Sequence, residues 1–191
     1  MPSIATADQI LDCAQTLLVD GGYNGFSYAD IAAVVGIRKA SIHHHFPAKA
    51  DLVRTLVGRY RGEAVVGLAA ISATVADPYD QLRAYVEYWR GCIAKAQPSY
   101  CICVMLAGEL PSLPEPVAAE VRAHFRSLAA WLGAAMARGS AEGCVRLHDT
   151  VETEAEAFVA TVHGAMLSAR ANGDPALFGT ITAPLLKRLT P

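Results

Sequence analysis

Basic and hydrogen-bonding side chains gather between residues 38 and 49 of this 191-residue chain. The segment holds Lys39, Ser41, His43 and His44 and contains no carboxylate. Side chains of these types donate hydrogen bonds to phosphate oxygens and to the edges of nucleic-acid bases. Their types and spacing therefore indicate a surface that binds an acidic partner.

Two short helices must position these side chains, and the sequence around them supplies the signals for both. Ser27 is a suitable N-cap for the first helix, and Gly36 can adopt the left-handed backbone that ends it. The second helix is expected from Arg38 to Phe46, where Pro47 stops it. This spacing is typical of a helix-turn-helix, although a purely structural helical hairpin has the same pattern.

The charge distribution favours DNA binding over a structural hairpin. The net charge is −2, which argues against a protein coated with basic residues. Residues 1–35 carry four Asp and no Lys or Arg, whereas residues 36–61 carry six Lys or Arg and one Asp. The excess of positive charge thus lies in the same segment that is expected to contact phosphates.

Three consecutive histidines, residues 43–45, raise the question of a metal site. Successive helical residues point about 100° apart, so three in a row cannot converge on one ion. We expect no metal here and no cofactor elsewhere, and we expect His45 to pack beneath the other two.

The same region resembles the DNA-binding signature of the TetR (tetracycline-repressor) family over about residues 8–54. The matching residues are Phe26-Ser27, Asp30-Ile31-Ala32, Val35-Gly36-Ile37, Ile42-His43-His44-His45-Phe46 and Lys49-Ala50-Asp51-Leu52. The resemblance implies contacts with phosphate, with base edges or with the major groove for Ser27, Tyr28, Lys39, Ala40, Ser41, His43, His44 and Lys49.

Two residues depart from the family pattern. His43 stands where the family usually has tyrosine, which keeps a hydrogen-bond donor and adds pH dependence near neutrality. Arg38 stands where a capping serine is common, so its side chain offers no capping oxygen and is free to reach DNA.

The rest of the chain predicts an all-α protein of about nine helices. Hydrophobic residues make up 53% of the sequence and recur three and four positions apart, as in buried helices. The longest uncharged apolar stretch, residues 64–76, is too short to span a membrane. We expect residues 1–47 to form the helix-turn-helix domain and residues 48–191 a ligand-binding and dimerisation domain, in a cytoplasmic protein without a membrane partner.

The last two helices, residues 151–171 and 175–189, are where the family resemblance implies pairing into a homodimer on a palindromic operator. Periodicity alone fits closure of the monomer core equally well. The candidate interface residues are Phe158, Val162, Ala165, Met166, Leu177, Ile181, Leu185 and Leu186.

The resemblance also implies a small-molecule effector pocket among the middle helices. Core packing is the competing interpretation for every candidate, because apolar residues at helical spacing are usually core. The candidates are Tyr85, Trp89, Cys92, Cys101, Met105, Leu106, Phe125 and His163.

Five scattered cysteines suggest free thiols rather than a disulfide framework. Cys101 and Cys103 are two apart, nearly opposite on a helix, and so predict neither a disulfide nor a zinc clip. Cys101 followed by Glu109 resembles the sixth-helix region of NemR-like electrophile sensors, which implies a reactive thiol at Cys101. Inert packing is the alternative.

Catalysis is not indicated, because the chain has no phosphate-binding glycine loop, nucleophile elbow or His-Glu-x-x-His pattern. Glu152, Glu154 and Glu156 are expected to be solvent-exposed surface charges. The sequence thus predicts a DNA-binding transcriptional regulator, expected as a repressor released by a small molecule or an electrophile, with an activator equally consistent. The alternative is a helical carrier or enzyme with an N-terminal interaction module.

Overall fold

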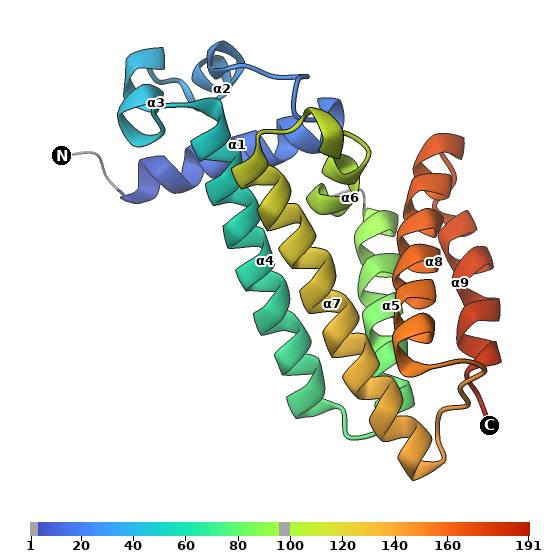
Figure 1. Cartoon of the computed structure of the whole chain (residues 1–191). Coiled ribbons are helices and arrows are strands. Elements are labelled where there is room, and N and C mark those ends of the chain that lie inside the picture. The colour runs from blue at the N-terminus through green and yellow to red at the C-terminus, as the bar shows by residue number, and fades with distance from the viewer. Residues whose placement is uncertain (1–3, 96–99) are drawn as a thin grey trace. The chain divides into compact units, whose positions relative to one another are not determined.

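Helical periodicity along the chain is realised as nine α-helices and one short 3-10 helix in a computed structural model that describes residues 4–95 and 100–191 (Figure 1). Those residues contain no strand. The helices are α1 (Ile4–Gly21), α2 (Tyr28–Val35), α3 (Lys39–His45), α4 (Lys49–Thr74), α5 (Pro78–Lys95), α6 (Ile102–Ala107), η1 (Leu110–Ser112), α7 (Glu115–Glu142), α8 (Val151–Asn172) and α9 (Ala176–Arg188). The all-α prediction is confirmed.

The described residues pack into two compact units that do not follow the expected boundary at residue 47. The first comprises the described part of Met1–Gly62 with Cys101–His124, and the second comprises Glu63–Tyr100, as far as described, with Phe125–Pro191. The first unit therefore adds half of α4, all of α6 and the start of α7 to the three N-terminal helices. Division into two functional domains at residue 47 stays a prediction.

In the first unit, α1 supplies the apolar surface on which α2, α3 and α6 pack. Its residues Ile10, Ala14 and Leu18 are fully buried at positions three or four apart. Ile31 of α2 and Ile42 of α3 are also fully buried, so each short helix is anchored by one large apolar side chain. Packing on α1 thus stabilises helices that are too short to be stable alone.

In the second unit, α8 and α9 lie side by side (Figure 1). The helix α5 also packs against α9. Phe158 and Phe178 are fully buried in this core. Gly173 ends α8 with φ +62°, a left-handed conformation that glycine adopts without steric cost.

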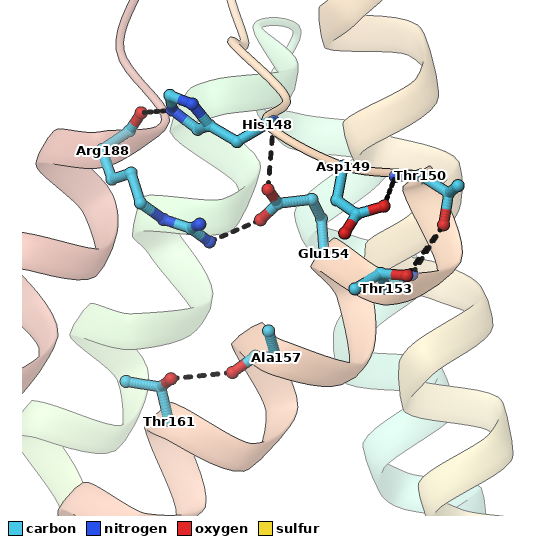
Figure 2. Close-up of polar contacts among 8 residues, drawn as sticks. All are labelled: His148, Asp149, Thr150, Thr153, Glu154, Ala157, Thr161 and Arg188. Atoms are coloured by element: carbon cyan, nitrogen blue, oxygen red, sulfur yellow. Dashed lines mark hydrogen bonds and ion pairs between the residues drawn. The ribbon is translucent and has the colours of Figure 1, made fainter.

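A buried carboxylate connects the two ends of this helical pair. Glu154 accepts a hydrogen bond from the backbone N–H of His148 at 3.0 Å and pairs with Arg188 at 2.5 Å, while His148 Nε2 lies 3.0 Å from the Arg188 carbonyl (Figure 2). The expectation of an exposed surface charge was wrong for Glu154, whose side chain is only 2% exposed. A partnered carboxylate tolerates such burial.

The sixth helix is shorter than the sequence suggests. The helix α6 ends at Ala107, before Glu109, and residues 110–112 form the 3-10 turn η1 around Pro111. Within the described part of the chain, no helix combines the length and apolarity needed to cross a bilayer.

Candidate nucleic-acid interface

The helix-turn-helix is fixed by a cap at its start and a glycine at its turn. Ser27 Oγ accepts a hydrogen bond from the Ala29 N–H at 3.2 Å, and the Ser27 N–H donates to the Asp30 carboxylate at 2.7 Å. The pKa of Asp30 is lowered, first because the Ser27 hydroxyl donates to it. Gly36 has φ +74° and donates its N–H to the Ala32 carbonyl at 3.0 Å, which turns the chain toward α3.

One face of α3 is exposed, while Ile42 alone of its seven residues is buried. The Arg38 side chain makes no capping hydrogen bond at the start of the helix, and His45 is half-buried, as expected for both. The exposed residues of this face are Arg38, Lys39, Ala40, Ser41, His43 and His44. The structure thus brings together six of the nine predicted DNA contacts.

Tyr28 is not available for a phosphate contact. It is 6% exposed, and its hydroxyl donates a hydrogen bond to the Phe46 carbonyl at 2.8 Å. Burial, followed by the nearby charge of Asp51, raises the pKa of Tyr28 to about 12. Phosphate oxygens only accept hydrogen bonds, and this hydroxyl has one proton to give. Tyr28 therefore ties α2 to the end of α3 instead of contacting DNA.

His43 is exposed but oriented by its neighbours. Its Nδ1 lies 3.3 Å from the Pro47 carbonyl, and its ring meets the Tyr28 ring edge-on with centroids 4.7 Å apart. Because a carbonyl oxygen can only accept, Nδ1 carries the proton in this contact. With Nδ1 as the donor in this contact, Nε2 is left as an acceptor, suited to a donor on a base edge.

Lys49 is used inside the domain. Its ammonium donates to the Phe26 carbonyl and lies 4.1 Å from the centroid of the Phe26 ring and 5.0 Å from that of Tyr23. Burial lowers the pKa of Lys49, and the charges of Asp30 and Glu109 partly offset this shift. These contacts connect the start of α4 to the segment before α2. The ammonium has three N–H donors and only one is used here, so a phosphate contact at Lys49 stays a prediction.

Ion pairs within the protein occupy two of the six Lys and Arg residues between positions 36 and 61. Arg59 pairs with Asp12 at 2.6 Å and Asp8 at 3.7 Å, and Arg61 pairs with Glu120 at 3.1 Å. Arg54 is exposed and, like Arg38 and Lys39, forms no ion pair with any described residue. Arg54 was missed as a candidate contact, although its charge and its place five residues after Lys49 were visible in the sequence.

A carboxylate from outside the helix-turn-helix holds the turn between α1 and α2. Glu109 accepts the Tyr23 N–H with both oxygens, at 3.0 and 3.2 Å. Gly22 has φ +73°, and a Cβ there would lie 2.1 Å from Glu109 Oε1. Only glycine fits both the backbone and the carboxylate at this position.

Most predicted dimer residues close the core of the single chain. Phe158, Val162, Ala165 and Met166 are fully buried without any partner chain, and Leu185 and Leu186 are 7% and 8% exposed. A side chain with no exposed surface has none to bury against a second protomer, so Phe158, Val162, Ala165 and Met166 are core residues of the single chain, and the dimer interface itself stays a prediction. Leu177 and Ile181 are half-buried, and the exposed sides of α8 and α9 bear the residues Ala157, Ala160, Gly164, Leu167, Thr180, Ala183 and Pro184.

The effector candidates divide between the units. Cys101, Met105 and Leu106 belong to the first unit, and the other five belong to the second. In the second unit, Phe125 meets His163 edge-on with ring centroids 5.3 Å apart. Tyr85 and Trp89 are buried, Cys92 is half-buried, and the Trp89 indole N–H has no hydrogen-bond partner in the described residues.

The predicted thiol sensor is inaccessible. Cys101 is fully buried, as is Cys103, and burial together with the hydrogen bond between the Cys103 and Cys101 thiols raises the pKa of Cys103 well above its usual value. Reactive cysteines combine exposure with a lowered pKa. Cys101 therefore lacks the exposure expected of an electrophile sensor.

Two family models cover most of the chain. Residues 10–56 match "Bacterial regulatory proteins, tetR family", and residues 78–183 match "Tetracyclin repressor-like, C-terminal domain". The second match alone covers more than half of the 191 residues.

Solved structures show the same fold over nearly the whole chain. A transcriptional regulator of the TetR family from Agrobacterium tumefaciens is 59% identical, with a TM-score of 0.96 over 98% of both chains. The reduced form of Escherichia coli NemR matches with a TM-score of 0.84 over 97% of this chain and 98% of that chain, at 18% identity, which shows the fold alone.

Curated relatives match over a short part of the chain. The biofilm operon icaADBC negative transcriptional regulator IcaR from Staphylococcus aureus is 44% identical over 45 residues, which is 24% of this chain and 24% of that protein. The chain therefore aligns with about a quarter of the length of these relatives.

Proposed function

Because the chain belongs to the TetR family of bacterial regulators, we propose that it is a cytoplasmic homodimer that represses transcription by placing α3 in the major groove of a palindromic operator. The observation that supports this most directly is the exposed face of α3. It presents Arg38, Lys39 and Ser41 with no carboxylate on the helix, on a scaffold fixed by buried Ile42.

The charges indicate how tightly a single helix-turn-helix binds. Arg38, Lys39 and Arg54 are the exposed and unpaired cations of the described part of residues 36–61. Three phosphate contacts per chain give weak binding at physiological salt, because phosphate contacts supply most of the electrostatic affinity. Pairing of two chains is thus a physical requirement for tight binding under this proposal.

The proposed dimer interface is the outward side of α8 and α9. Residues 157–169 of α8 and 176–186 of α9 contain no Asp, Glu, Lys or Arg, and small or apolar residues on both helices are exposed. An uncharged helical surface of this kind is suited to isologous pairing with a second copy of the chain.

The proposed effector site lies in the second unit, near Trp89. A buried indole N–H without a partner is uncommon and favours a ligand that carries a hydrogen-bond acceptor. Phe125 and His163 are in contact with each other in the same unit and supply aromatic surface. We propose that such a ligand releases the protein from DNA.

A gel-shift experiment tests DNA recognition directly. The probe is the DNA that flanks the gene for this chain, with an unrelated duplex of equal length as competitor. Lys39→Ala is expected to weaken binding about 10- to 100-fold, because it removes one phosphate contact per chain and two from the dimer. Lys95→Ala, which removes an exposed lysine at the end of α5, is the matched control and is expected to bind normally.

The carrier or enzyme alternative makes the opposite prediction. Under that alternative, no shift specific to the flanking DNA is seen, and Lys39→Ala behaves like Lys95→Ala. Either result on properly folded protein overturns the proposal.

A further inference from the structure

Two cysteines and a histidine converge inside the first unit. Cys101 is the N-cap residue of α6, Cys103 is the second residue of that helix, and His124 comes from α7. Their ligand atoms all lie within 4.8 Å of one another, and Cys101 Sγ is 3.7 Å from His124 Nε2. Cys101 and Cys103 are fully buried, and His124 is 5% exposed.

The backbone before α6 explains why residues two apart meet. On a continuous helix their side chains would point to nearly opposite sides. Cys101 has φ −67° and ψ 121°, which is extended rather than helical, so its thiol turns toward the side occupied by Cys103. The expectation that the two cysteines lie nearly opposite on a helix does not apply, because the helix begins after Cys101.

We propose that Cys101, Cys103 and His124 form a binding site for a soft d10 metal ion, Zn²⁺ or Cu⁺. Thiolate and imidazole are the ligands that these ions prefer. Bonds of about 2.3 Å to sulfur and 2.0 Å to nitrogen place ligand atoms about 3.5–3.8 Å apart at tetrahedral angles. The 3.7 Å between Cys101 and His124 already matches that separation.

The surroundings suit a bound cation with two thiolates. Arg61 lies close enough to influence Cys103 and is itself paired with Glu120 at 3.1 Å. Each thiol releases its proton to solvent when its sulfur binds the ion, so two thiolates and a neutral imidazole carry charge −2. Zn²⁺ cancels this charge, whereas Cu⁺ leaves −1 beside the Arg61–Glu120 ion pair.

Simple packing explains the cluster less well. A buried core that required only volume would be filled by apolar side chains, and an imidazole nitrogen directed at a buried thiol adds polar groups to the core. Electrophile sensing fits poorly as well, because neither thiol is exposed.

The position of the site also links it to DNA binding, and this part rests on the proposed function. α6 packs against α1, and Glu109, two residues after α6, holds the N–H of Tyr23 in the turn before α2. An ion that draws α6 toward His124 would act on the same segment that holds this turn. Metal binding is therefore expected to change operator affinity.

Metal titration of the full, reduced, metal-free protein tests the site without DNA. Zn²⁺ is titrated against a chromophoric chelator, Cu⁺ against a copper(I) chelator, and Mg²⁺ serves as a hard-ion control. We expect one Zn²⁺ or Cu⁺ per chain and no competition by Mg²⁺. Cys101→Ser, Cys103→Ser and His124→Gln are each expected to weaken binding at least about 100-fold, because each removes a ligand. Cys13→Ser, which changes a half-buried cysteine of α1, is expected to bind normally.

Co²⁺ substitution provides a reading that does not depend on the variants. Thiolate-to-cobalt charge-transfer absorption in the wild-type protein is expected at one equivalent, so a variant that fails to fold leaves the test intact. Absence of this absorption, together with no Zn²⁺ or Cu⁺ bound, overturns the proposal, and so does full binding by folded Cys101→Ser. Gel shifts with and without the ion are scored separately: a protein that binds the ion but no DNA refutes the proposed function and leaves the site standing.

Discussion

The hydroxyl of Tyr28 has one proton, and the Phe46 carbonyl accepts it at 2.8 Å. The Lys49 ammonium donates one hydrogen bond to the Phe26 carbonyl and lies near two aromatic rings. Arg38 and Lys39, in contrast, are exposed and form no ion pair among the described residues. Some polar side chains of the helix-turn-helix therefore hold its segments together, whereas others are exposed and unpaired, as DNA contacts require.

Tyr28→Phe distinguishes these two roles. The variant keeps the buried ring but leaves the Phe46 carbonyl without its donor, so we expect the free energy of unfolding to fall by about 1–2 kcal/mol. Operator affinity, measured well below the melting temperature, is expected to change less than about twofold, since the hydroxyl makes no DNA contact under this account. A tenfold loss of affinity with unchanged stability in urea denaturation would instead show a direct phosphate contact.

The turn between α1 and α2 shows how one element controls another. Gly22 has φ +73°, and its open side is filled by the Glu109 carboxylate that accepts the Tyr23 N–H. Glu109 belongs to the segment between α6 and η1, 86 residues away in sequence from Tyr23. The orientation of α2 therefore depends on a segment outside the helix-turn-helix.

Gly22→Ala tests this dependence. The new Cβ would meet Glu109 and require a left-handed conformation that alanine disfavours by about 1–2 kcal/mol, so we expect a loss of stability of at least that size and weaker operator binding. Gly21→Ala is the matched control, because nothing lies within 4 Å of its added Cβ and α1 already includes residue 21. Thermal melts of both variants decide the matter, and equal effects at the two positions would contradict the account.

Helical periodicity made the elements predictable, but not the contacts between distant segments. The caps at Ser27 and Gly36 and the exposed face of α3 follow from local pattern. The hydrophobic periodicity of the sequence does not reveal that Glu109 contacts Tyr23 or that Glu154 is buried beside Arg188. These contacts depend on how the helices pack. In the sequence, a polar residue that will be buried by a distant partner looks the same as one that stays on the surface.

At the scale of the whole molecule, tight DNA binding requires two helix-turn-helices to act together, because each has only a few unpaired cations. The outward sides of α8 and α9 are uncharged over most of their length, while Phe158 and Val162 beneath them are fully buried in the single chain. The proposed interface therefore lies over a core that the single chain already buries by itself. The protomer is expected to remain folded when the dimer is separated.

Leu167→Glu tests the position of that interface. Leu167 is 46% exposed on α8, and a carboxylate there would be buried against its copy in the partner, so we expect a folded monomer in sedimentation velocity and at least about tenfold weaker operator binding. Val66→Glu, at a residue 70% exposed on α4, is the control and is expected to stay dimeric. A dimeric Leu167→Glu protein would place the interface elsewhere.

Operator binding as a function of salt concentration is the most direct test of the central claim. With Arg38, Lys39 and Arg54 from each of two chains, about six phosphates are neutralised, so the logarithm of the binding constant should fall with the logarithm of salt concentration with a slope of about −5. The account predicts this slope, two chains per palindromic site and a loss of about two units of slope in Arg54→Ala, which removes two contacts from the dimer. A slope near zero, or equal affinity for unrelated DNA at every salt concentration, would contradict it.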